Sequence, residues 1–145
     1  MNTEILSAKE YLSQAYRIDQ RINSKLEQAQ SLRELSERAT MTLSDMPGSG
    51  TRNVHRMDGI ITKMVDLETE ISDDLNRLLD LKHEIVTMVK CVEIPELQTL
   101  LDLRYLCFRT WEDISMELHY DIRHIRRMHS RALDEIDSIR CKGCP

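Results

Sequence analysis

The chain has 145 residues and a formal net charge of −5, and it contains 4 Gly, 3 Pro and 1 Phe. This length suits one or two small units, and so few turn-forming and aromatic residues leave little material for β-sheets. The acidic balance argues against binding nucleic acid over the whole surface. No apolar run approaches the roughly 18 residues of a membrane-spanning helix, and residues 1–7 do not resemble a signal peptide. We therefore expect an all-α, cytoplasmic protein with no part in a membrane.

The first predicted element is a long helix over about residues 3–38. Its apolar residues recur every three or four positions, at Ala8, Tyr11, Ala15, Ile18, Ile22, Ala29 and Leu32. This spacing is that of one helix face. Lys25 alone interrupts the stripe, which is richer in alanine than the seam of a strong dimeric coiled coil.

A mobile loop is predicted next, over about residues 40–53. It contains Pro47, Gly48 and Gly50 amid Ser and Thr, and these residues break helices. We expect it to be the internal segment most sensitive to proteases. Long helices of similar length on either side can fold back on each other as a coiled-coil-like antiparallel hairpin.

The second long helix is predicted over about residues 54–93 and carries a heptad seam. Asp74 is the one polar residue of this seam. Its apolar members are Met57, Ile60, Met64, Leu67, Ile71, Leu78, Leu81, Ile85, Met88 and Val92. A flanking row widens the stripe, so the helix must bury more than one narrow seam: Ile61, Val65, Leu75, Leu79, Val86 and Val89. We interpret the seam as an oligomerisation surface and expect a homo-oligomer, most simply a dimer. The alternative is a core within one chain.

Pro95 is predicted to separate a body, residues 1–93, from a head, residues 95–140. Proline suits the first turn of a new helix and disfavours helix at Ile94 before it. The helix that follows carries five leucines that can pack over the remaining helices and complete a three-helix head: Leu97, Leu100, Leu101, Leu103 and Leu106.

Residues 110–133 are predicted to form two short helices joined by a tight turn. Thr110 can cap the first helix, in which Ile114 and Leu118 share one face. His119 begins the turn, and Asp121 can cap the second helix. This order of cap, helix, turn, cap and helix is typical of a helix-turn-helix.

The second of these helices, residues 121–133, has two chemically different sides. Its apolar side is spaced to pack on the first helix and consists of Ile125, Met128, Ala132 and Leu133. Its other side consists of Arg123, His124, Arg126, Arg127, Ser130 and Arg131. A helix of this kind fits a DNA major groove, and guanidinium groups bind phosphates and the acceptor edge of guanine. The alternative is a solvated helix face.

From about Pro95 to Ile136 the sequence resembles region 4 of the sigma-70 family. The matching features are Leu-x-Leu-Arg-Tyr at Leu101 to Tyr105, Thr-Trp-Glu-Asp-Ile from Thr110, and Ile-x-x-Met-x-x-x-Ala-Leu from Ile125 to Leu133. The whole chain is similar to small prophage-encoded late transcription regulators of the ArpU/RinA-like kind. The resemblance implies a helix-turn-helix head that reads promoter DNA. It implies base and backbone contacts at Arg123, His124, Arg126, Arg127 and Arg131.

Residue patterns for catalysis or for metal binding are weak. No Gly-rich phosphate loop is present, and His83-Glu84 has no second His four residues on. Cys141 and Cys144 have the spacing of half a zinc site. We expect reduced cysteines, no metal, no cofactor and no enzymatic activity.

These observations favour a sequence-specific transcriptional regulator of phage or prophage type that reads double-stranded DNA with the helix 121–133. The N-terminal body would set the oligomeric state or contact RNA polymerase. Two alternatives remain: a small terminase subunit, and a helical adaptor or structural protein whose head binds another protein such as RNA polymerase. Binding through several arginines should weaken steeply with salt, whereas binding through leucines should not.

Overall fold

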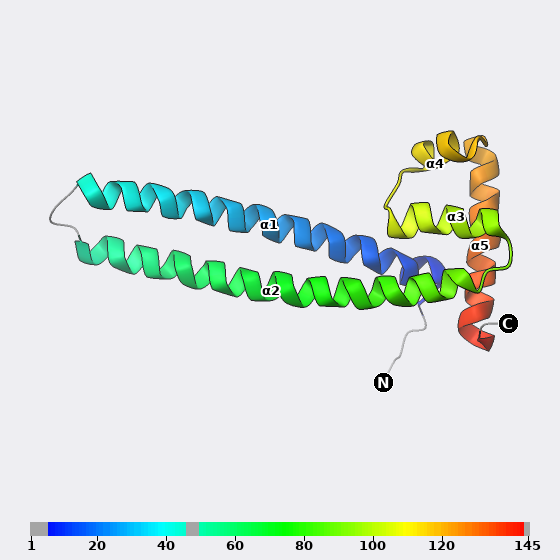
Figure 1. Ribbon diagram of the computed structural model, residues 1–145, viewed down its shortest axis with the longest axis horizontal. Coiled ribbons are helices and arrows are strands. Elements are labelled where there is room, and N and C mark those ends of the chain that lie inside the picture. The colour runs from blue at the N-terminus through cyan, green and yellow to red at the C-terminus, as the bar shows by residue number, and fades with distance from the viewer. Residues whose placement is uncertain (1–5, 46–49, 144–145) are drawn as a thin grey trace. The chain divides into compact units, whose positions relative to one another are not determined.

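The computed structural model describes the backbone of residues 6–45 and 50–143, and the side chains of residues 6–41 and 54–143. This part of the chain is all-helical, as the sequence predicts, and contains no strand (Figure 1). The elements in order are α1 (Ala8–Asp45), α2 (Gly50–Lys90), α3 (Pro95–Leu101), the π-helical turn η1 (Asp102–Leu106), α4 (Trp111–Leu118) and α5 (Ile122–Lys142). None of the described helices is long and apolar enough to span a bilayer.

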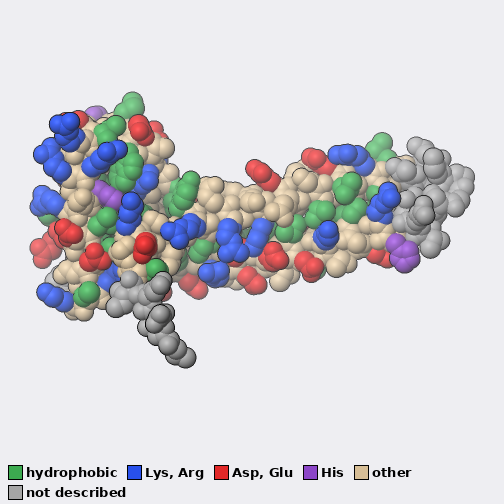
Figure 2. Space-filling view, turned by 180° about the vertical axis from the view of Figure 1, so that it is seen from behind, with side chains coloured by type: hydrophobic (Ala, Val, Ile, Leu, Met, Phe, Trp, Pro, Cys, Tyr) green, Lys and Arg blue, Asp and Glu red, His purple; other side chains and the backbone are tan. Residues whose placement is uncertain are grey.

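The chain divides into two compact units. We call Asp19–Arg77 the hairpin unit, and Met1–Ile18 together with Leu78–Pro145 the terminal unit. Charged side chains are spread over the visible surface of both units (Figure 2). This grouping differs from the expected division at Pro95, because the first turns of α1 and the last turns of α2 pack with the C-terminal helices.

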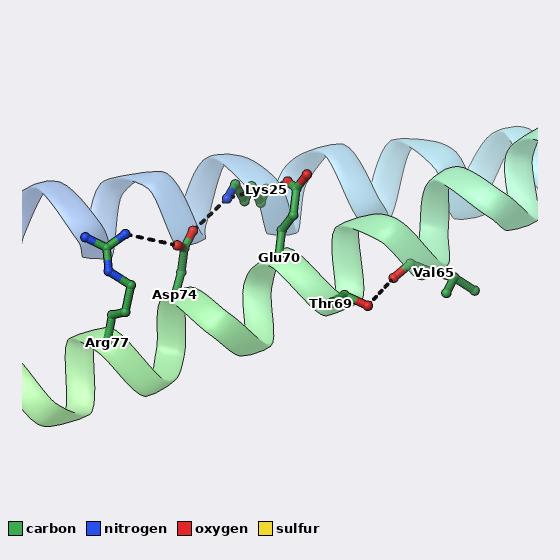
Figure 3. Close-up of polar contacts among 6 residues, drawn as sticks. All are labelled: Lys25, Val65, Thr69, Glu70, Asp74 and Arg77. Atoms are coloured by element: carbon green, nitrogen blue, oxygen red, sulfur yellow. Dashed lines mark hydrogen bonds and ion pairs between the residues drawn. The ribbon is translucent and has the colours of Figure 1, made fainter.

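In the hairpin unit, α1 and α2 run antiparallel as the sequence predicts (Figure 1). Among the described residues, the buried apolar side chains of this unit are Ile22 of α1 and Ile60 and Ile71 of α2. The two polar interruptions of the predicted stripes meet here: Lys25 Nζ lies 2.7 Å from Asp74 Oδ2 and 3.5 Å from Glu70 Oε2 (Figure 3). The hydrogen bond from Lys25 lowers the pKa of Asp74, against the opposing effect of burial.

The ends of the two long helices differ from the predicted ones. Helix α1 begins at Ala8 and continues to Asp45, and α2 begins at Gly50, so most of the expected loop 40–53 is helical. Residues 40–45 contain neither Gly nor Pro and can therefore continue the helix. Residues 46–49 lie outside the described part of the chain, and the predicted protease sensitivity stays a prediction.

The core of the terminal unit draws on every helix of the protein. Fully buried side chains come from α1, α2, α3, α4 and α5: Leu12, Ile85, Leu97, Leu100, Leu101, Ile114, Ile125 and Ile136. Polar contacts fix the start of α1 to this core. The amide of Ala8 donates to Asp137 of α5 at 3.1 Å, and the Tyr11 hydroxyl donates to Glu84 of α2. The N-terminal turns are therefore part of the fold around α5.

The segment between Pro95 and Thr110 departs from a simple helix. Pro95 opens α3 as predicted, with Ile94 in an extended conformation (φ −88°, ψ 116°). The last turn widens into η1, where the amide of Cys107 donates to the Asp102 carbonyl at 3.0 Å. Phe108 then takes a left-handed backbone conformation (φ 58°), which is strained for a bulky residue. This reversal brings Thr110 into position to start α4.

Helix α5 is longer than the predicted 121–133. It spans Ile122–Lys142 as one helix. The apolar spacing continues through buried Ile136, and no Gly or Pro occurs between Ile122 and Lys142. The additional turns carry Asp137 and Arg140, which contact the start of α1. The second half of α5 therefore anchors the helix, and the first half leaves its charged side in solvent.

Candidate functional site

Helices α4 and α5 are each capped at their first turn, and a further hydrogen bond closes the turn between them. The Thr110 hydroxyl accepts from the Asp113 amide at 3.2 Å and the Asp121 carboxylate accepts from the His124 amide at 2.7 Å, which confirms both predicted caps. His119 ends α4 in a left-handed conformation (φ 61°, ψ 37°), a strained choice for a residue other than glycine. The Ser115 hydroxyl donates to the Tyr120 carbonyl across the turn. Such a turn fixes the direction in which α5 leaves α4.

The exposed side of α5 gathers five of the six predicted site residues. Arg123, Arg126, Arg127, Ser130 and Arg131 are exposed, and with Ile122 they line an open depression of about 780 Å³. The sixth, His124, is half-buried and its ring packs on Tyr120 with centroids 4.6 Å apart. His124 therefore lies beside this depression and does not line it, and its predicted role in DNA binding stays a prediction.

Ile122 is a member of this surface that the sequence reasoning missed. Its side chain is 37% exposed, although it is a large aliphatic group at the first position of α5. The signal for it lies in the spacing, because residues 122, 126 and 130 fall four apart on one helix face.

The electrostatics of the depression are one-sided. Its lining contains four arginines and no carboxylate. Within the described part of the chain, none of these guanidinium groups forms an ion pair, since the ion pairs involve Lys25, Arg77 and Arg140. Figure 2 shows Lys and Arg side chains gathered along the edge of the terminal unit where α5 lies. The site therefore presents guanidinium groups that have no carboxylate partner among the described residues.

A buried histidine supports the other side of α5. His129 is only 8% exposed, and its Nε2 lies 2.6 Å from the Tyr105 hydroxyl. Trp111 packs edge-on against its ring at 4.6 Å, and the Arg104 guanidinium lies 4.3 Å above the Trp111 ring. Burial, with help from the positive charges of Lys9 and Arg104, lowers the pKa of His129 to about 4. The ring is therefore neutral at pH 7 and can accept a hydrogen bond from the Tyr105 hydroxyl.

The ten apolar residues of the predicted seam, nine on α2 and Val92 two residues after its end, are buried or half-buried within one chain. In the hairpin unit Ile60 and Ile71 are buried, and Met57, Met64 and Leu67 are half-buried. In the terminal unit Leu78, Leu81, Ile85 and Val92 are buried, and Met88 is half-buried. The seam thus serves as the intramolecular core that the sequence left open as an alternative. What remains exposed on α2 is part of the flanking row.

The cysteines and acidic residues give no geometry for a metal. Among the described residues, no three His, Cys, Asp or Glu side chains come together in a way that could hold an ion. Cys107 and Cys141 are free and exposed, and Cys144 lies outside the described residues. Cys91 is disulfide-bonded, so the expectation of reduced thiols throughout is wrong for this residue.

Comparison with known proteins places this arrangement in a family. Residues 15–138 match the family described as "Protein of unknown function (DUF722)". The chain belongs to the DUF722 family. The match begins in α1 and ends in α5, so it covers most of the long helix pair and all of the α4–α5 turn. No curated protein and no solved structure matches the chain.

Proposed function

We propose that this DUF722 protein is a sequence-specific, DNA-binding transcriptional regulator of phage or prophage type that reads duplex DNA with the first half of α5. The proposal is carried by one observation. Four guanidinium groups, none of them ion-paired to a described residue, project from one exposed face of a helix that is capped at its start and anchored along its other side.

The dimensions and chemistry of this face suit a DNA major groove. The groove admits one α-helix, and an arginine fork can donate two hydrogen bonds to O6 and N7 of guanine or to phosphate oxygens. An anchored helix also loses little conformational freedom on binding, which lowers the cost of association. The acidic remainder of the molecule would disfavour other orientations on the DNA.

The resemblance to sigma-70 region 4 supports the same function. Two of the aromatic residues that carry it, Tyr105 and Trp111, both pack against His129 on the buried side of α5. Their structural role is therefore to hold α5 in place. Base or phosphate contacts then belong to Arg123, Arg126, Arg127 and Arg131, with Ser130 as a further polar contact.

A second candidate function is favoured by a different observation. Met116 of α4 is 77% exposed, and together with half-exposed Ile122 it gives the α4–α5 region an apolar component. Such a surface suits an adaptor whose head binds another protein, for example RNA polymerase. A small terminase subunit is a further alternative within DNA binding.

Selection of bound sequences from a random duplex pool tests the proposal directly. Arg127 lies between buried Ile125 and Met128 on the face expected to meet base edges, and Arg131 lies nearer the expected phosphate path. We expect Arg127→Ala to cost about 1–3 kcal/mol and to relax preference at one base pair. We expect Arg131→Ala to weaken binding to all sequences alike and to reduce the salt slope by about one unit.

Arg33→Ala is the matched control, because Arg33 is exposed on α1 in the hairpin unit and its loss changes the net charge equally. This variant should bind like the parent. If Arg127→Ala and Arg131→Ala, shown to be folded by circular dichroism, bind selected and random duplexes as the parent does, α5 does not read DNA. Binding to a protein partner that is insensitive to salt would then support the adaptor.

A further inference from the structure

Helix α2 carries a second row of apolar side chains that its pairing with α1 leaves in solvent. In the hairpin unit, Ile61, Val65 and Leu75 are 49%, 54% and 49% exposed. With Glu68 and Ser72, which are also exposed, they follow one another at intervals of four and three residues. This spacing makes one continuous face of the helix, beside the buried seam. We call these five residues the α2 flank.

Two threonines whose hydroxyls are bonded to the helix backbone border the α2 flank. The next row outward contains Thr62 and Thr69, whose hydroxyls donate to the carbonyls of Asp58 at 2.8 Å and Val65 at 3.0 Å. Because these hydroxyls are bonded to their own helix, they offer little to solvent. Figure 3 shows Thr69 and Val65 turned away from Asp74 and Glu70, which point toward α1. Charged groups concentrate on the opposite side of α2, at Lys63, Asp66, Glu70, Asp73 and Arg77.

The order of residues along the α2 flank is self-complementary when the helix is reversed. If a second α2 runs antiparallel with its centre at residue 70, Val65 lies opposite Leu75 of the second copy and Glu68 lies opposite Ser72. Two-fold symmetry repeats each pair. Ile61 extends the apolar strip by one turn at either end. No like charges oppose each other, and the serine hydroxyl can donate to the carboxylate.

We propose that two copies of the chain associate through the α2 flank, with the two α2 helices antiparallel. This assigns self-association to Ile61, Val65, Glu68, Ser72 and Leu75 and not to the inward-facing seam. The proposal does not depend on DNA binding. Only a few large apolar side chains per copy take part, so the association should be weak, with a dissociation constant on the order of micromolar.

A charge-exchange experiment on the full chain tests both the face and the orientation. Sedimentation equilibrium of the parent at about 1–100 μM should show a monomer–dimer equilibrium. Val65→Glu alone and Leu75→Lys alone should each weaken dimerisation at least tenfold, because each brings a charge to an apolar contact. The double variant Val65→Glu/Leu75→Lys should recover dimerisation, because the antiparallel pairing sets the new carboxylate against the new ammonium group.

Lys63→Glu is the matched control, since it reverses a charge on the opposite side of the same helix and should leave the dimer unchanged. Circular dichroism should show full helicity in every variant, because the substituted side chains are exposed and Glu and Lys favour helices. A parent that stays monomeric at 100 μM would overturn the proposal. So would single variants that dimerise like the parent, and a double variant that stays monomeric would overturn the antiparallel pairing.

Discussion

At the scale of single residues, the neutral His129 behind the arginine face couples stability to pH. Its pKa is about 4 in the folded protein against an ordinary 6.5, so the unfolded chain binds a proton first as the pH falls. Stability is therefore complete above about pH 6.5 and decreases toward pH 4. One pKa unit is worth about 1.4 kcal/mol, which limits the loss to about 3 kcal/mol. Urea denaturation at several pH values would measure it.

His129→Gln is the comparison that isolates this effect from the titration of carboxylates. The glutamine side chain can accept a hydrogen bond from the Tyr105 hydroxyl but cannot ionise. We expect the parent to lose more stability than this variant between pH 7 and pH 4. Parallel stability curves for the two proteins would show that His129 is not the titrating group.

Lys25 and Asp74, the polar residues that interrupt the two apolar stripes, should stabilise the hairpin as a pair. Lys25→Met leaves the buried Asp74 carboxylate without its 2.7 Å partner. We expect a loss of about 1–3 kcal/mol, less than for a pair deep in a core because the two-helix layer is thin. Lys25→Met with Asp74→Leu should recover that stability, since both polar groups are then replaced by apolar ones. Chemical denaturation of the four proteins in the cycle gives the coupling energy, and Glu70→Gln serves as the exposed control. A double variant whose loss of stability equals the sum of the losses in the two single variants would show that the pair is not coupled.

At the scale of helices, capping preferences and helical spacing predicted those features that depend on neighbouring residues in the sequence. The caps at Thr110 and Asp121, the turn that begins at His119 and the apolar spacing of the α2 seam follow from residue type and spacing within a few turns. Spacing alone left open whether the seam packs within one chain or between chains. The Lys25–Asp74 pair could also be predicted once the hairpin is assumed. Residues that lie opposite each other in an antiparallel hairpin have numbers that add to a nearly constant sum. The free guanidinium groups of α5 followed from the same helical spacing.

Other features depend on contacts between distant residues and could not be read locally. The π-helical turn at Asp102–Leu106 and the strained Phe108 arise where the chain must reverse to begin α4. The inclusion of α1 in the terminal unit depends on Asp137 and Arg140, more than a hundred residues away in sequence. The burial of His129 needed knowledge of Tyr105 and Trp111 as its neighbours. The row of arginines on α5 can be seen in the sequence, whereas the packing of Tyr105 and Trp111 against His129 on the buried side of this helix cannot.

At the scale of the whole molecule, self-association and DNA reading would reinforce each other. A two-fold dimer carries two α5 faces, and dimeric readers of this kind bind two half-sites related by a dyad. We therefore expect selection with the parent protein to yield an inverted repeat. Once one α5 is bound, the second binds as an intramolecular step, which commonly raises affinity by about 10²–10⁴-fold.

Val65→Glu separates these two contributions, because it changes the α2 flank and leaves the α5 surface intact. It should bind a single half-site as the parent does, and it should lose most of the parent's additional affinity for the inverted repeat at the same salt concentration. Fluorescence anisotropy with half-site and full-site duplexes measures both quantities. Lys63→Glu should retain the parent's preference for the full site. If the parent selects a single asymmetric site and Val65→Glu binds it equally well, each copy reads DNA alone and the α2 flank plays no part in recognition.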